Sequence, residues 1–499
     1  MAFAAAAVYA NSLFGGFVYD DWPLIVENAS LRAPGVLLRL LASTYWGETG
    51  ATGGLYRPLT MMTYAIQPVS PFGFHLVNLI LHACISVMLI PLFTRLGATI
   101  RIAATAAICF AVLPIHTEAV ASIVGRAELL SALFLIVSWL LAMEITPVRW
   151  VGSLVCFGLA LLSKESAAIF PALLILGDRF VHGEKKRRAA HWLSLFVVLF
   201  LYLQWRYLIT GAVFKTGGSA YFADMPLPTV WITMIQFLWE GYLIPALTGL
   251  GLQAEYPPGS YTATASSWSV LAATAGLFAF AYKTRGLPRF AILFFFAATI
   301  PICNLFFRID VIGAERLLYF PSIGLCLLVG IAFDRYAGKP WAKPVALACL
   351  CWWSGATIVR NRVWASEEAF WGRLAEQTPH SARAYNGLGV HEGRKGRHEE
   401  AARYYKQALS LEPNHRLARY NLAKTQFELG ELDIAETGFR KLVSEKEDSD
   451  SLVFIGVIAQ GRGDRAAAIA AYRKALTLAP YHPTANYNLR LLLQEQPRP

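Results

Sequence analysis

Apolar stretches separated by charged residues, proline or glycine fill the first 360 residues of the chain. Apolar segments lie near residues 1–16, 74–94, 102–114, 128–143, 148–163, 166–180, 191–210, 268–283, 290–306, 317–333 and 344–360. A helix needs about 20 apolar residues to cross a bilayer, and the shorter segments have soft boundaries. The pattern predicts an all-α polytopic membrane bundle with about eleven spans.

One further apolar segment, 230–247, is interrupted by Glu240 and contains Pro245 near its end. Counting it as a full span would move the later basic loops to the other side of the membrane. Such loops belong on the cytoplasmic side. We therefore interpret this segment as an interfacial or re-entrant helix on the outer face.

After Arg360 the pattern changes, and positions begin to recur every 33 or 34 residues. The recurring sets are Ala384/Ala418, Leu388/Leu422, Gly396/Gly430/Gly463, Ala401/Ala435/Ala468, Tyr405/Phe439/Tyr472 and Pro379/Pro413/Pro480. The third unit has Glu447 where a proline is expected. Small residues at helix crossings, a turn glycine and a terminal proline are typical of stacked helical hairpins. We predict a membrane domain over 1–365 and a tetratricopeptide-repeat (TPR) α-solenoid over 366–499.

Composition supports a membrane protein, because only 15% of the residues are charged and 56% are hydrophobic. Globular chains carry roughly 25% charged residues. The net charge of +11 gathers largely in three short gaps between apolar segments, at 185–188, 283–289 and 335–343. Short basic loops are typical of the cytoplasmic side, so nucleic-acid binding is disfavoured.

The same positions predict a cytoplasmic N-terminus, an outer loop at 17–73 and an extracytoplasmic repeat array. We expect a multi-pass protein of a bacterial inner membrane, or of the endoplasmic reticulum membrane in a eukaryote. The first ten residues lack a basic start and are interpreted as part of a first span, not as a cleaved signal. All seven cysteines lie in apolar segments without a CxxC pair, so neither a disulfide framework nor a zinc site is expected.

Charged and histidine side chains near the ends of the spans gather on the predicted outer face. A charged residue within a bilayer costs about 2.5–3.5 kcal/mol on insertion scales, so such residues tend to be functional. The set is Asp20, Asp21, Glu27, Arg57, His75, Asn78, His116, Glu118, Arg126, Glu128, Lys164, Glu165, Arg206, Glu240, Asp310, Glu315 and Arg316. We interpret their convergence on one surface as a site.

Asp20 and Asp21 follow directly after the first span. A carboxylate at this place suits a general base acting on a hydroxyl, or a ligand of a divalent metal. The structural alternative is a solvated turn or a helix cap.

Four basic residues, Arg126, Lys164, Arg206 and Arg316, lie at the outer ends of spans. Guanidinium groups bind phosphate oxygens through two hydrogen bonds, and lysine adds a point charge. Head-group anchoring is the structural alternative. Anchoring needs no acidic partner, so the neighbouring Glu128, Glu165 and Glu315 favour a phosphate site.

His75, Asn78 and His82 share one helical face, and His116 precedes Glu118 in the stretch PIHTE (114–118). No HExxH zinc motif is present. Packed, hydrogen-bonded histidines are the main interpretation, with a catalytic role as the alternative.

Several of these stretches together resemble one family. They are FVYDD (17–21), YRPLT (56–60), FHLVN (74–78), PIHTEAVASIVGRAE (114–128), SKE (163–165) and GAERLLYFPSIG (313–324), in this order and followed by repeats. The chain resembles the transmembrane and TPR-containing O-mannosyltransferases, the TMTC family of GT-C class membrane glycosyltransferases. The resemblance covers nearly the whole length, with a short first span and a short array as departures.

The resemblance implies transfer of mannose or a similar hexose from a polyprenyl-phosphate donor to a hydroxyl of a protein acceptor, outside the cytosol and with inversion. It assigns Asp20 or Asp21 as the base, and Arg126, Lys164, Arg206 and Arg316 as ligands of the donor phosphate. The supporting polar residues are Arg57, His75, His116, Glu118, Glu128, Glu165 and Glu315. No cofactor and no divalent metal are expected, because the donor carries one phosphate. The expected partners are the lipid-linked donor, membrane lipids and a peptide or protein in the repeat groove.

Two alternatives stay open. In the first alternative, the protein is a glycosyltransferase that acts on a lipid-linked or envelope glycan. In the second, it is a non-enzymatic TPR scaffold for envelope assembly. A scaffold needs only one or a few spans and leaves the polar cluster unexplained. A transporter would want charges near the bilayer midplane and repeated halves, and the sequence has neither.

Overall fold

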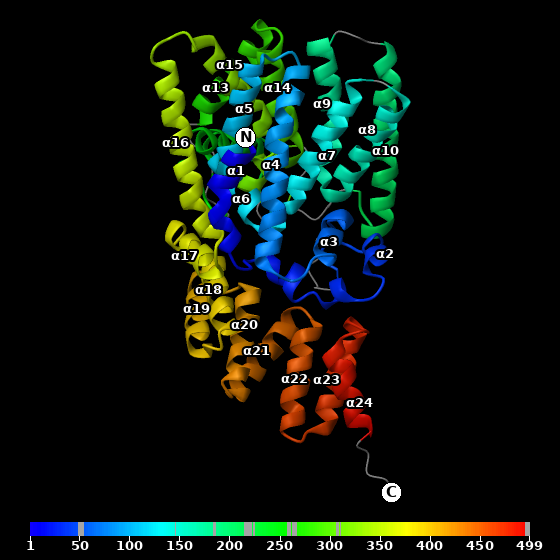
Figure 1. Ribbon diagram of the computed structural model, residues 1–499. Helices are drawn as coiled ribbons and strands as arrows, with labels where there is room; N and C mark the ends of the chain where they lie inside the picture. Colours follow the sequence, from blue (N-terminus) through cyan, green and yellow to red (C-terminus); the bar gives the residue numbers. More distant parts are fainter. Residues whose placement is uncertain are drawn as a thin grey trace. The chain divides into compact units, whose positions relative to one another are not determined.

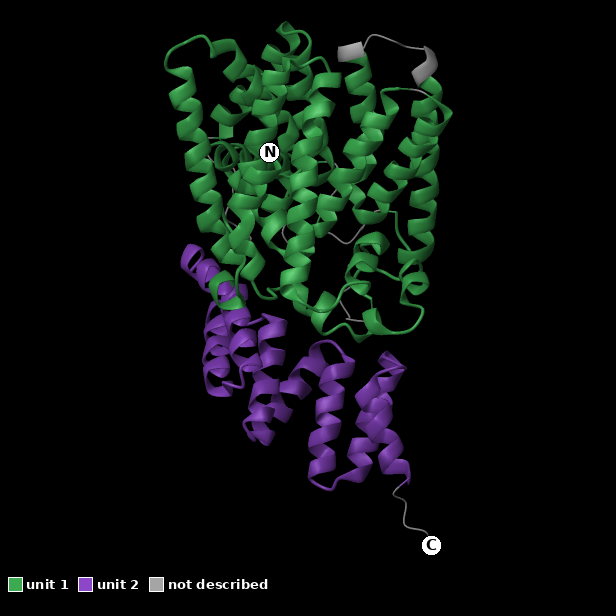
Figure 2. Cartoon of the chain, viewed as in Figure 1, with its two compact units in different colours: residues 1–370 green, residues 371–499 purple. Residues whose placement is uncertain are grey.

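The computed structural model describes residues 1–47, 54–144, 146–182, 186–213, 222, 225–256, 261, 267–305, 309 and 311–494. Every regular element in these ranges is a helix, which confirms the all-α prediction. Lys185 of the first basic gap and Asp310 of the outer-face set lie outside the described residues. The chain forms two compact units, Met1–Phe370 and Trp371–Pro499, coloured separately in Figure 2.

The first unit is built from long helices joined by short helical turns (Figure 1). Its α-helices are α1 (Ala2–Tyr9), α2 (Val36–Leu40), α3 (Pro58–Ala65), α4 (Pro71–Arg95), α5 (Ile100–Val112), α6 (Thr117–Ala121), α7 (Arg126–Ala142), α8 (Pro147–Ser163), α9 (Phe170–Gly177), α10 (Lys186–Thr210), α11 (Leu227–Phe237), α12 (Ile244–Thr248), α13 (Ser267–Lys283), α14 (Leu287–Thr299), α15 (Ser322–Tyr336) and α16 (Ala342–Asn361). The short turns are η1 (Ala10–Phe14), η2 (Trp22–Val26), η3 (Ala29–Arg32), η4 (Pro114–His116), η5 (Ile123–Gly125), η6 (Glu165–Ile169), η7 (Asp178–His182), η8 (Leu238–Leu243), η9 (Ile300–Ile302), η10 (Glu315–Leu318) and η11 (Arg362–Trp364).

Several of these helices are long and apolar enough to cross a membrane. Within the described ranges there are five, Pro71–Arg95, Ile123–Ala142, Ala189–Thr210, Leu227–Thr248 and Ala342–Trp364, and the pair Ile100–Val112 and Pro114–Ala121, bent by 51°, makes a sixth if it is one span. The first unit is therefore a multi-pass helical membrane unit. The count of eleven spans stays a prediction. So does the re-entrant interpretation of 230–247, since the helix around it is long enough to cross.

Close helix packing holds the first unit together, as expected where lipid removes most of the hydrophobic drive between helices. A Cβ placed on Gly330 of α15 would lie 2.6 Å from the carbonyl oxygen of Ile102 in α5. Between α7 and α8, the hydroxyl of Ser138 donates to the carbonyl of Ser153 at 2.8 Å. The small residue and the buried hydroxyl each allow two helix backbones to approach.

The described parts of the predicted outer loop, residues 17–47 and 54–73, are folded at one end of the helices, where α2 and α3 lie (Figure 1). A separate hydrophobic core supports it, made of Leu24, Ile25, Leu31, Leu40, Tyr45, Met61, Tyr64, Phe74 and Ile123. Phe74 belongs to α4 and Ile123 to η5. This segment is thus packed against the helices that carry the polar residues.

The second unit is a series of helical hairpins. After α17 (Glu367–Gln377), which begins in the first unit, come α18 (Ala382–Arg394), α19 (His398–Leu411), α20 (Arg416–Glu428), α21 (Leu432–Glu445), α22 (Ser449–Gly461), α23 (Arg465–Leu478) and α24 (Pro483–Gln494). The predicted turn glycines Gly396, Gly430 and Gly463 all have positive φ (74°, 81° and 78°), which glycine adopts without steric cost. In the repeat that has Glu447 in place of a proline, Asp448 caps α22 by accepting the Ser451 N–H at 2.8 Å.

Candidate functional site

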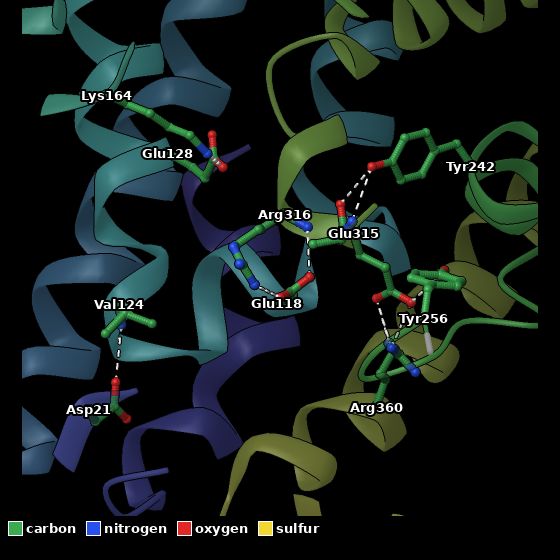
Figure 3. Close-up of polar contacts among 11 residues, drawn as sticks. Asp21, Glu118, Val124, Glu128, Lys164, Tyr242, Tyr256, Glu315, Arg316 and Arg360 are labelled. Atoms are coloured by element: carbon green, nitrogen blue, oxygen red, sulfur yellow. Dashed lines mark hydrogen bonds and ion pairs between the residues drawn. The ribbon is translucent and has the colours of Figure 1, made fainter. Parts of the chain in front are cut away.

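Asp21 is a buried structural carboxylate at the start of the folded outer loop. It is 1% exposed. Its Oδ2 accepts the Val18 N–H at 2.8 Å. Its Oδ1 accepts the Val124 N–H at 3.2 Å, as Figure 3 shows. Burial raises its pKa to about 8, against the opposing effect of the Val18 hydrogen bond. Asp21 therefore joins the loop after the first helix to η5, with both oxygens already engaged.

Asp20, the preceding residue, has a different environment. Its side chain is half-buried, and its carboxylate accepts no hydrogen bond from the described residues. Burial raises the pKa of Asp20 to about 6, while the charges of Arg316 and Arg57 oppose that rise. Asp20 thus combines a raised pKa with a carboxylate that no donor among the described residues occupies, and the charges of two arginines act on it.

Arg316, the basic residue whose charge acts most on Asp20, forms an ion pair with Glu118. The Arg316 guanidinium contacts Glu118 Oε1, and the Arg316 backbone N–H donates to Glu118 Oε2 at 2.9 Å (Figure 3). The Glu118 side chain is 2% exposed, whereas that of Arg316 is 32% exposed. Arg316 is therefore held in place on one side and accessible on the other.

Next to Arg316, Glu315 is fully buried in an ion pair with Arg360 of α16. Arg360 Nη2 lies 2.7 Å from each carboxylate oxygen, and its Nε lies 3.1 Å from Oε2 (Figure 3). The Tyr242 hydroxyl bonds to both the N–H and the carbonyl of Ala314, each at 3.1 Å. These contacts fix the backbone that carries Arg316.

A third group surrounds the start of α3. Arg57 Nε donates to Glu165 Oε2 at 3.0 Å, the Tyr56 N–H donates to Glu165 Oε1 at 3.1 Å, and the guanidinium lies 5.0 Å from the Tyr45 ring centroid. Although burial opposes ionisation, Arg57 and Arg206 hold the pKa of Glu165 below its ordinary value. Glu165 is therefore a carboxylate that keeps Arg57 in position.

Lys164 forms an ion pair with Glu128 of α7, and both side chains are buried (Figure 3). Burial lowers the pKa of Lys164, the charges of Arg57 and Arg316 lower it further, and Glu165 and Glu118 oppose the shift. Five separate segments of the first unit thus contribute the predicted residues Asp20, Arg57, Glu118, Lys164, Glu165 and Arg316.

Arg126 and Arg206 differ from the accessible Arg316, because both are buried and neutral protein acceptors occupy their guanidinium groups. Arg126 is 0% exposed. Its acceptors are Asn78 Oδ1 at 3.0 Å, Thr63 Oγ1 at 3.3 Å, the Thr63 carbonyl at 3.4 Å, Gln67 Oε1 and the Phe74 carbonyl at 2.9 Å. Arg206 donates to the carbonyls of Val213 and Gly54 at 2.6 and 2.8 Å. A phosphate would have to displace these contacts, so a donor-binding role for either arginine stays a prediction.

The histidines lie inside the helix packing. His116 bonds to the Phe110 carbonyl at 3.0 Å and to Ser322 Oγ at 2.7 Å. His82 bonds to Tyr319 and Ala111. His75 is buried close under Gly15, and neither ring nitrogen has a hydrogen-bond partner among the described residues. For His116 this geometry favours the packed, hydrogen-bonded interpretation.

Two residues near the site were not predicted from the sequence. Glu255 is close enough for the charges of Asp20, Arg316 and Glu118 to act on it, and burial raises its pKa to about 7. Arg360 pairs with Glu315, as described above. Arg360 carried the same signal as the predicted basic residues, a cation at the end of an apolar segment, whereas Glu255 carried none.

No group of three or more His, Cys, Asp or Glu side chains within the described ranges is arranged to hold a metal ion. The expectation that the reaction needs neither a cofactor nor a metal stays a prediction.

Comparison with known proteins relates the sequence of this chain to a family. Three tetratricopeptide-repeat family models match residues 361–414, 394–454 and 449–482. Human Protein O-mannosyl-transferase TMTC4 is 28% identical over 491 residues, covering 80% of this chain and 64% of that protein. The chain is a homologue of the TMTC proteins, with C-terminal TPR repeats. The predicted resemblance is confirmed.

Other TMTC relatives match over a similar range. Mouse Protein O-mannosyl-transferase TMTC3 is 28% identical, covering 87% of this chain and 53% of its own, and human TMTC1 is 27% identical, covering 85% and 56%. The chain thus spans between about half and two thirds of the length of these relatives. Among solved structures, MamA from Desulfovibrio magneticus RS-1 is 18% identical, covering 30% of this chain and 80% of that chain, with a TM-score of 0.23.

Proposed function

We propose that this TMTC homologue transfers mannose or a similar hexose from a polyprenyl-phosphate donor to a hydroxyl of a protein acceptor. The observation that carries the proposal is that the Asp20 carboxylate accepts no hydrogen bond from the described residues, while the charges of Arg316 and Arg57 act on it at one end of a membrane helical unit. A membrane-embedded enzyme suits a lipid-linked donor. The relatives TMTC4 and TMTC3 are named as protein O-mannosyl-transferases, which agrees with transfer of a hexose to a protein hydroxyl.

We assign the general base to Asp20 and not to Asp21. A base must be able to reach the hydroxyl that it deprotonates. Both Asp21 oxygens accept backbone N–H groups, whereas the Asp20 carboxylate accepts none from the described residues. Its raised pKa also makes it a better proton acceptor than an ordinary aspartate.

The proposed step is a single displacement. The acceptor oxygen forms a bond to C1 of the sugar while its proton passes to Asp20. The bond between C1 and the phosphate oxygen breaks, and that oxygen takes the electron pair. The leaving polyprenyl phosphate gains a negative charge, which fixed cations stabilise where the charge develops. Arg316 is the accessible candidate for stabilising this charge. Arg57 and Lys164 are further candidates, and each is paired with a glutamate. Displacement from the opposite face gives inversion at C1.

For the second unit we propose acceptor binding. Stacked TPR hairpins form extended surfaces that hold peptides or proteins. A protein acceptor suits such a surface better than a glycan does. The proposal further places the site and the repeats on the extracytoplasmic side, as the three basic loops predict.

The test is transfer of radiolabelled mannose from synthetic polyprenyl-phosphate mannose in proteoliposomes, with a protein fraction from the source cells as the acceptor. Asp20→Asn is expected to abolish transfer, whereas Asp21→Asn is expected to retain part of it. Asp334→Asn is the matched control, because Asp334 forms an ion pair with the exposed Arg101. Full activity in Asp20→Asn would sink the assignment of the base. Transfer to a lipid-linked glycan and not to protein would favour the glycan alternative.

A further inference from the structure

The turn that carries Asp20 contains a residue in an unusual backbone conformation. Tyr19 has φ of +54°, and among the described non-glycine residues only Asn304 shares a positive φ. The left-handed region brings the Cβ of a residue close to the following carbonyl oxygen, and tyrosine lacks the short polar side chain that eases this strain for asparagine. Such conformations persist only where surrounding contacts determine them.

Local hydrogen bonds close the turn on one side of Tyr19. The Asp21 N–H donates to the Val18 carbonyl at 3.1 Å, and the Val18 N–H donates to Asp21 Oδ2 at 2.8 Å. The Trp22 N–H donates to the Tyr19 carbonyl at 3.3 Å. These bonds fix the ends of the turn, and Asp20 lies between them.

A distant part of the chain holds Tyr19 from the other side. The Tyr19 ring stacks on Phe370, with centroids 5.6 Å apart and planes 15° apart. Phe370 is 2% exposed and packs on Trp364 with ring centroids 4.8 Å apart. The Gly16 N–H donates to the carbonyl of Ala365 at 2.9 Å. The segment 364–370 therefore covers the turn at two points.

We propose that Tyr19 and Phe370 are positioning residues for Asp20. Their stack holds Tyr19 in the left-handed conformation, and that conformation directs the Asp20 carboxylate toward the acceptor. The inference rests on the proposed function, because it takes Asp20 as the base. Phe370 is in α17, the helix that leads into the repeats, so the geometry of the base depends on the segment joining the two units.

The test separates positioning from stability through kinetics on purified protein in proteoliposomes. Phe370→Ala is expected to lower kcat by about 10- to 100-fold, the range that a misplacement of about 1 Å produces. The KM for the polyprenyl-phosphate hexose is expected to stay the same, because glutamates hold the proposed donor-binding cations Arg316, Arg57 and Lys164 in place. Phe370→Tyr keeps a stacking ring and is expected to restore kcat. Phe278→Ala removes an aromatic pair between α13 and α14 and is the matched control.

A double-mutant cycle tests whether the effect passes through Tyr19. Tyr19→Gly permits positive φ without steric cost but leaves the turn unfixed, so it is expected to lower kcat. Adding Phe370→Ala to Tyr19→Gly is expected to have no further effect. An equal loss in both backgrounds would show that Phe370 acts elsewhere and would overturn the inference, as would a Phe370→Ala variant with unchanged kcat.

Hydrogen exchange gives a readout that does not need activity. The Val18 and Val124 amides are bonded to Asp21 in the closed turn, so Phe370→Ala is expected to speed their exchange while Phe278→Ala does not. If the parent protein transfers no sugar, the proposed function fails, and faster exchange still supports the structural part of the inference. Unchanged exchange together with normal transfer in Phe370→Ala refutes the positioning role alone.

Discussion

The buried pair of Glu315 and Arg360 allows a quantitative prediction. Glu315 has no exposed surface, and its carboxylate receives three contacts of 2.7–3.1 Å from Arg360. Arg360 Nη1 also donates to the Leu252 carbonyl at 3.1 Å. In Arg360→Met the methionine preserves much of the packing volume but removes every one of these donors.

Breaking a buried ion pair by removing one partner costs about 3–5 kcal/mol, because the remaining charge is left without compensation. Burial raises the pKa of Glu315, and Arg360 opposes this rise. Removal of Arg360 therefore raises that pKa further and favours the protonated carboxyl. A folded-state pKa above the unfolded value contributes stability at low pH that is lost as pH rises through it. We therefore expect Arg360→Met to be more destabilised, relative to the parent, at pH 8.5 than at pH 6.

The double variant Arg360→Met with Glu315→Gln separates charge from packing. It removes the ionisable group, so its loss of stability is expected to be smaller and independent of pH. Unfolding is measured by denaturant titration in detergent, with a thiol-reactive dye reporting exposure of the buried Cys109, Cys303 and Cys326. A free-energy loss below about 1 kcal/mol for Arg360→Met at pH 8.5 would refute the reasoning, because such a value is typical of an exposed pair.

Three further predictions concern the site. Because the base must be ionised and burial raises the pKa of Asp20 to about 6, kcat/KM is expected to rise with pH through about 6; a profile flat from pH 5 to 8 would contradict this. Arg316→Ala is expected to lower kcat by about 10²–10³-fold, the loss typical of one transition-state donor, and an unchanged kcat would remove Arg316 from the reaction. Gly125→Ala places a Cβ 2.3 Å from the Ala119 carbonyl oxygen. We therefore expect overpacking to destabilise the protein by about 1–3 kcal/mol. A denaturation midpoint equal to that of the parent would argue against that clash.

Much of the architecture could be predicted from local pattern. The repeat positions occur at a regular spacing, and each repeat folds mainly against its neighbours, so Gly396, Gly430 and Gly463 fall in turns with positive φ. The apolar segments predicted the membrane helices for the same local reason. Their number is harder to predict, because helices such as Pro147–Ser163 are shorter than a full span, and length alone does not decide whether they cross.

The roles within the site depended on tertiary contacts that local pattern does not contain. Asp20 and Asp21 are adjacent and chemically identical, and tertiary contacts such as those of Asp21 with the Val18 and Val124 amides distinguish them. Arg126 has the same sequence signal as Arg316, a cation at the end of an apolar segment. Hydrogen-bond acceptors on α3 and α4 occupy the guanidinium group of Arg126. No spacing rule could have predicted which cation stays accessible.

The pairing of the cations has a consequence for the proposed reaction. Arg316, Arg57, Lys164 and Arg360 each contact a glutamate, so the site carries little net positive charge before substrate binds. A polyprenyl-phosphate sugar has one phosphate charge in the ground state and gains a second as the sugar leaves. Catalysis comes from interactions that are stronger in the transition state than in the ground state. Cations that are pre-oriented and partly neutralised bind the first charge weakly, yet need no reorganisation when the second develops. On this reasoning, the glutamates contribute to turnover by holding the cations in place, and not by increasing the affinity for the donor.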